Sequence, residues 1–141
     1  MKLIQSICIL LLFLLCTFAL GQQEQAVTNI DNTKLSERQH YRVTFTSKLD
    51  PIVINTMHAW IIQIENKTGE PVLNADINVV GGMPEHNHGL PTRPQVTKNL
   101  GDGCYLLEGL KFHMSGWWQI TIAILDNEIS DTVTFDLQLQ N

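Results

Sequence analysis

Apolar and polar residues alternate with a period of two along most of this chain, and turn signals interrupt the alternation about every ten residues. Residues 41–47 alternate in this way, and Val133, Phe135 and Leu137 share one face of a closing segment over residues 129–139. We find no segment with a sustained helical period. The pattern predicts an all-β fold, an immunoglobulin-like antiparallel β-sandwich of seven or eight short strands, with a small barrel as the alternative.

Turn-forming residues set the boundaries of the expected strands. Gly81-Gly82 is expected to end a strand, and Gly109 to mark a bulge. Because neighbouring strand residues point to opposite faces, one of Trp117 and Trp118 must lie in the core and the other outside. The expected strands cover residues 41–47, 52–54, 58–64, 72–80, 95–97, 117–125 and 129–139, and residues 104–107 and 110–114 are expected to form one further strand that the bulge interrupts.

The N-terminus has the features of an export signal. Lys2 is followed by an apolar run over residues 3–20, and Ala19-Leu20-Gly21 places small residues at a cleavage site. We therefore expect residues 1–21 to be a signal peptide, so that the protein is exported. A retained N-terminal membrane anchor is the alternative, since the apolar run is close to the length that spans a bilayer.

The remaining residues are enough for one domain. Residues 22–40 are polar and are expected to form a flexible tether, and residues 41–141 to form the β-sandwich domain. The formal net charge of −5 argues against nucleic acid and anionic membrane surfaces as partners. Cleavage would remove Cys8 and Cys16, which leaves Cys104 without an internal disulfide partner. We expect Cys104 to be a small buried hydrophobe, and metal ligation or an intermolecular bridge is the alternative.

A cluster of metal-ligating residue types follows the Gly81-Gly82 pair. Met83, His86 and His88 lie within six residues, on a segment whose prolines exclude a helix. Two imidazoles that are two residues apart in an extended segment point to the same side, and Met83 can fold back over the same centre. Sulfur with imidazole favours Cu(I), whereas imidazole alone suits Zn, Cu or Ni. An ordinary solvated polar loop is the alternative.

A second pair, His113-Met114, lies just before Gly116. If the strand over residues 110–114 is regular, Met114 faces the core and His113 faces water. The other interpretation is that Met114 closes the mouth of the sandwich beside His86 and His88. The pair Met57-His58, at the start of another strand, is expected to be structural.

Catalytic motifs are missing from the sequence. We find no serine in a nucleophile elbow and no glycine-rich phosphate loop, and nothing near Cys104 that would activate a thiolate. The protein is therefore expected not to be an enzyme.

Two motifs in this order carry a family resemblance: Met83-Pro84-x-His86-x-His88-Gly89 and Phe112-x-Met114-x-Gly116-x-Trp118, with Gly69-Glu70-Pro71-Val72 and Gly103-x-Tyr105 around them. On these residues the chain resembles the YtkA-like family, which is related to FixH-type proteins and includes members labelled auxin-binding protein. The resemblance covers about residues 41–139 and implies an exported or membrane-tethered bacterial β-sandwich. FixH-type relatives are associated with cytochrome oxidase assembly, which involves copper.

The motif positions that carry over are Met83, His86, His88 and Met114. The chain departs from the family at Ser115, where many relatives have proline, and FixH-type proteins keep a membrane anchor that signal cleavage would remove here.

These observations together predict a non-enzymatic exported protein that binds Cu(I) through Met83, His86, His88 and Met114. We expect it to be periplasmic or secreted, or anchored in the membrane and facing the periplasm, with membrane contact only through an uncleaved N-terminus. Its partner would be a membrane oxidase or another envelope protein, and not nucleic acid. The alternatives are an envelope protein–protein interaction module without a metal, and a small-ligand binder with a cavity between the sheets.

Overall fold

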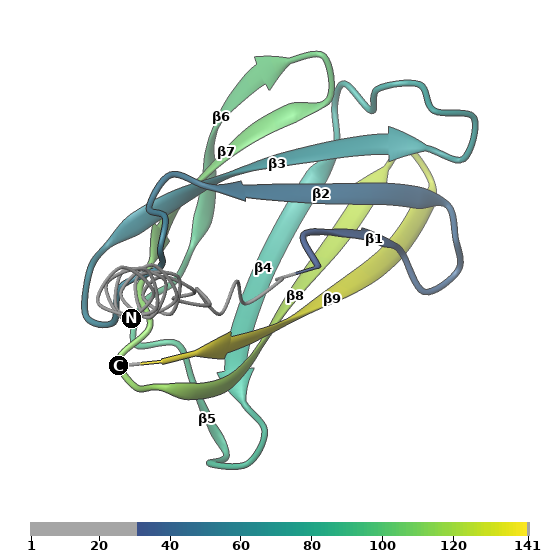
Figure 1. Cartoon of the computed structure of the whole chain (residues 1–141). Coiled ribbons are helices and arrows are strands. Elements are labelled where there is room, and N and C mark those ends of the chain that lie inside the picture. The colour runs from purple at the N-terminus through teal and green to yellow at the C-terminus, as the bar shows by residue number, and fades with distance from the viewer. Residues whose placement is uncertain (1–30, 141) are drawn as a thin grey trace, which may run out of the picture.

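A computed structural model describes residues 31–140 of the chain. These residues form two antiparallel sheets, with strand orders β1-β2-β3-β7-β6 and β5-β4-β8-β9, and no helix (Figure 1). The predicted all-β antiparallel sandwich is thus confirmed, although the strands number nine because the short edge strands β1 and β5 were not expected. The strands are β1 Thr33–Leu35, β2 Tyr41–Ser47, β3 His58–Asn66, β4 Asp76–Met83, β5 His88–Gly89, β6 Gln95–Gly101, β7 Cys104–Leu110, β8 Gly116–Asp126 and β9 Ile129–Leu139.

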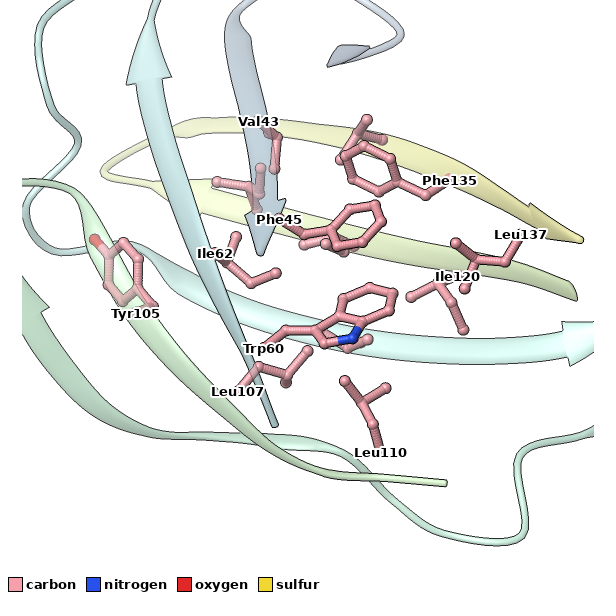
Figure 2. Packing of buried hydrophobic residues seen from close by; sticks show 14 of the residues in the cluster. Val43, Phe45, Trp60, Ile62, Tyr105, Leu107, Leu110, Ile120, Phe135 and Leu137 are labelled. Atoms are coloured by element: carbon pink, nitrogen blue, oxygen red, sulfur yellow. The ribbon is translucent and has the colours of Figure 1, made fainter. Parts of the chain in front are cut away.

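The core lies between the two sheets and follows from the alternation in the sequence. Phe45 of β2 stacks on Trp60 of β3 with ring centroids 4.1 Å apart, and it meets Phe135 of β9 edge-on at 4.9 Å (Figure 2). The contact between Phe45 and Phe135 joins the two sheets, since β9 belongs to the four-stranded sheet. Of the adjacent tryptophans, Trp118 is fully buried and Trp117 is half-buried, as the alternation predicted.

The predicted tether is wrong for residues 31–40. Strand β1 pairs with β2, and Ser36 Oγ, which follows β1, donates a hydrogen bond to Asp131 Oδ2 of β9 at 2.7 Å. The polar composition of this segment suggested a tether. Its apolar residues are too sparse to predict the edge strand β1, and the buried carboxylate of Asp131 that holds the segment lies far away in the sequence. The predicted signal peptide over residues 1–21, and the rest of the tether to residue 30, lie outside the described residues. Within residues 31–140, no helix is long and apolar enough to cross a membrane.

Two of the strand boundaries expected before the candidate cluster are also wrong. Residues 52–54 form no strand. Gly81-Gly82 does not end a strand, because β4 continues through both glycines to Met83, pairing Gly81 with Ile120 and Gly82 with Gln119 of β8. The same strand begins only at Asp76, which leaves Leu73 about half exposed, at 52%.

Strand β7 departs from expectation at its end. The predicted bulge near Gly109 is confirmed, because Ala59 of β3 lies opposite two residues of β7 and Gly109 has a φ of 86°. The strand then ends at Leu110, so the expected strand over residues 110–114 does not form. Residues 111–115 instead form an irregular connection to β8.

Candidate functional site

The Met/His segment is a tight hairpin at one end of the sandwich, formed by β4, a turn and β5 (Figure 1). Met83 lies directly opposite His88 in the β4–β5 pairing. His86 N donates to Met83 O at 3.1 Å, and Asn87 takes the left-handed conformation, with a φ of 51°, that closes the turn. Opposite residues of an antiparallel pair project from the same face, so the thioether and the imidazole of this pair lie on one side. Met83 is buried, at 1% exposure.

Three imidazoles gather around this hairpin. The His88 ring has the His86 ring 5.7 Å away, nearly parallel at 19°, and the His113 ring 4.9 Å away, inclined at 43°. His86 is exposed, whereas His88 and His113 are half-buried. His88 is therefore the centre of the cluster, with one neighbour toward solvent and one toward the fold.

Trp118 forms the wall of the cluster on the core side. Its ring is 6.0 Å from that of His88 and 5.4 Å from that of His113, and both imidazoles meet it at steep angles. The Trp118 Nε1 group donates a hydrogen bond to Met114 O at 3.0 Å. This bond fixes the connection between β7 and β8, and so it holds His113 next to the hairpin.

For the second pair, His113-Met114, the structure shows the reverse of what a regular strand would give. His113 does not face water but joins the cluster, and the Met114 side chain is 38% exposed rather than in the core. The expectation failed because the strand ends at Leu110 and the chain bends before Gly116. The turn propensity of Ser115-Gly116 was the one sequence signal against a regular strand here.

Of the four residues predicted to bind metal, three are brought together. Met83, His86 and His88 share the hairpin, whereas Met114 contributes its backbone carbonyl to the cluster and exposes its side chain at the rim. His113 is the residue that the sequence interpretation missed as a site residue.

Two ring nitrogens in the cluster have no hydrogen-bond partner among the described residues. His88 Nδ1 and His113 Nδ1 are both buried and unpaired. A buried polar atom without a partner is unfavourable, and an unprotonated imidazole nitrogen is a metal ligand. The donor set at this position is therefore chemically suited to a metal ion that accepts nitrogen.

A third donor is available as sulfur. No group of three His, Cys, Asp or Glu side chains within residues 31–140 is arranged to hold a metal ion. Met83 offers a thioether next to the imidazoles, because it lies opposite His88 in the hairpin pairing and Gly116 leaves space for it: a Cβ on Gly116 would lie 2.8 Å from Met83 Cε. Two imidazoles and a thioether fit a soft ion such as Cu(I) better than a hard ion, which prefers oxygen.

His58 lies at the same end of the sandwich but serves the core. It is 8% exposed, packs on Phe112 at 5.5 Å, and has Nδ1 3.2 Å from Thr56 O. Burial lowers the pKa of His58 below its ordinary value of 6.5, which keeps the ring neutral. These contacts support the structural role expected for His58, whereas Met57 beside it is 58% exposed.

Cys104 lies at the opposite end, after the β6–β7 turn. It is half-buried, and its Sγ is 3.8 Å from Asp102 O, so it is less buried than expected. The imidazole cluster therefore has no cysteine thiolate among the described residues.

Comparisons with known proteins agree with the motifs of this site. The YtkA-like family model matches residues 35–123, which include the hairpin, the connection before β8 and Trp118. No curated protein and no solved structure matches the chain. Because the match covers more than half of the sequence, the chain belongs to the YtkA-like family.

Proposed function

We propose that this protein is an exported, non-enzymatic copper carrier that binds Cu(I) at the hairpin cluster formed by Met83, His86 and His88. The observation that carries the proposal is the pair of buried ring nitrogens without partners, on His88 and His113, next to a buried thioether. Sequence spacing alone predicted Met83, His86 and His88 as site residues, and their proximity in the hairpin supports binding of one shared metal ion.

The donor types favour Cu(I) over other ions. Thioether sulfur selects soft metals, and neutral imidazole binds copper well. Thiolate ligands would be open to oxidation in the oxidising compartment that we expect for this protein. A site without thiolates would hold copper there and release it to a partner, for which a membrane oxidase is the class of acceptor that we propose.

The rival function, an envelope interaction module without a metal, would use the outer tryptophan and the proline-rich loop as its docking surface. Trp117 is half-buried, and its Nε1 group donates to Asp136 Oδ1 at 3.0 Å. The hydrogen bond fixes the orientation of the indole on its own sheet, and it is the buried ring nitrogens of the cluster that favour the metal-binding function.

A competition titration tests the proposed function. The purified protein is titrated with Cu(I) under reducing conditions against a chromophoric chelator, together with the double variant His86→Ala/His88→Ala. We expect the wild type to withdraw one Cu(I) per chain from the chelator and the double variant to withdraw none.

His40→Ala is the matched control, because His40 lies at the other end of the sandwich, 3.3 Å from Asp131. It should compete as the wild type does. Equal and poor competition by the wild type and the double variant would show that the protein is not a copper carrier.

A further inference from the structure

We propose that His113 is an inner ligand of the metal, together with His88 and Met83, and that His86 is an outer ligand through which the ion is exchanged. This inference rests on the Cu(I) binding proposed above and assigns separate roles within that site. It departs from the motif positions, because His113 occupies a variable position of the Phe-x-Met-x-Gly-x-Trp motif.

The geometry of the two half-buried rings points to a shared ion. The His88 and His113 ring centroids are 4.9 Å apart and the rings are inclined at 43°. Bonds between a transition-metal ion and an imidazole nitrogen are about 2 Å long, so rings at this separation can each direct one nitrogen at the same ion. The nitrogens left without partners, Nδ1 of each ring, are the atoms that such an ion would satisfy.

The sulfur of Met83 completes the inner set from the β4 side. Met83 lies opposite His88 in the hairpin pairing, and its terminal methyl group fills the space that the absent side chain of Gly116 leaves. Gly116 has a φ of 119°, a conformation that L side chains rarely adopt. Position 116 therefore both turns the chain into β8 and allows the thioether to approach the cluster.

Trp118 shields the inner set from water on the core side. It is fully buried, and both inner imidazoles lie against it. An indole ring attracts a cation placed near its face. Its Nε1–H bond to Met114 O also makes it a positioning residue, because that bond fixes the segment that carries His113.

His86 has a different environment. It is exposed, and its ring stacks nearly parallel on His88 at 5.7 Å. A ligand on the solvent side of His88 can detach without opening the fold, so His86 is placed to pass the ion to or from a partner.

The separate roles of His113 and His86 predict different effects on the affinity for Cu(I) and on the rate of its transfer. Variants His113→Ala and His86→Ala are compared with the wild type in the Cu(I) competition titration, and their transfer of Cu(I) to an excess of chelator is followed by stopped flow. We expect His113→Ala to weaken affinity by at least about tenfold. We expect His86→Ala to change affinity by less than about threefold but to slow transfer by about tenfold or more.

His113→Gln, which keeps a polar side chain of similar length, replaces the alanine variant if the latter does not fold, and His40→Ala is again the control. If the wild type binds Cu(I) while His113→Ala binds as tightly and His86→Ala does not bind, the assignment of inner and outer ligands is overturned and the copper-binding function stands. If the wild type does not bind, the proposed function fails, and this inference with it.

Discussion

Asp131 provides a quantitative test of how the N-terminal segment is held to the sandwich. Its side chain is 1% exposed, and it accepts hydrogen bonds from Ser36 Oγ at 2.7 Å and from the backbone N–H groups of Arg38, His40 and Thr132 at 2.8–3.2 Å. Burial by itself raises the pKa of this carboxyl, but the four donors outweigh it and lower the pKa from 3.8 to about 2. Since each pKa unit is worth about 1.4 kcal/mol, the ionised carboxylate contributes about 2 kcal/mol of folding stability at neutral pH.

The pH dependence follows from the direction of this shift. Because the pKa of Asp131 is lower in the folded state than in the unfolded state, its contribution is complete above about pH 5 and is lost as the pH falls toward 2. Asp131→Asn should therefore lower the free energy of unfolding by about 2 kcal/mol at pH 7, and the difference from wild type should shrink by more than half at about pH 2.5.

The measurement is urea unfolding followed by tryptophan fluorescence at both pH values. Asp102→Asn is the matched control, because Asp102 is exposed at the β6–β7 turn and has a φ of 49° that asparagine also tolerates. This control should unfold as the wild type does at pH 7. A variant Asp131→Asn as stable as wild type at pH 7, or a difference that does not change with pH, would refute the role given to this carboxylate.

Two further substitutions test the packing that positions the site and the domain. Gly116→Ala should displace Met83, because the added Cβ would lie 2.8 Å from Met83 Cε. The variant should bind Cu(I) at least about tenfold more weakly in the competition titration. Unchanged binding would argue against a thioether ligand. Tyr105→Phe removes the hydroxyl that donates to Val72 O at 2.6 Å and accepts from Ala75 N at 3.0 Å. The free energy of unfolding, measured in urea, should fall by about 1–3 kcal/mol. A decrease near zero would mean that water replaces the hydroxyl.

The alternation of apolar and polar residues in the sequence was sufficient to predict most of the fold. Strand β9 has the bounds that the pattern predicted, because Asp126-Asn127 marks its turn and its apolar residues alternate to the end. The two-sheet sandwich follows from the same pattern. The prediction that Gly81-Gly82 ends a strand was wrong, because a glycine pair usually weakens a strand but here continues the pairing of β4 with β8.

The candidate site was predictable only in part. Met83, His86 and His88 were found because a short segment keeps its residues close whatever the fold. His113 could not be assigned, because its direction depends on where β7 ends and on the bond from Trp118 to Met114 O, which are properties of the tertiary structure. Met114, which matches a motif position, was expected to contribute its side chain as a ligand, and the structure leaves this residue 38% exposed.

The imidazole cluster lies at one end of the sandwich, where two connecting segments of the chain meet. At this end the β4–β5 hairpin and the connection before β8 are joined by side-chain and backbone contacts around Trp118. The β4–β5 hairpin and the connection before β8 set the distance between His88 and His113, while the exposed residues His86 and Met114 lie at the solvent edge. Such an arrangement is what the proposed division into inner ligands and one outer ligand requires.

X-ray absorption spectroscopy of the Cu(I)-loaded protein is the decisive measurement for the proposed site, because it identifies the elements bound to the metal. We expect a first coordination shell of imidazole nitrogen, supplied by His88 and His113, and of sulfur from Met83, and the sulfur signal should disappear in Met83→Leu. A first shell of nitrogen and oxygen alone in the wild-type protein, or a sulfur signal that persists in Met83→Leu, would contradict it.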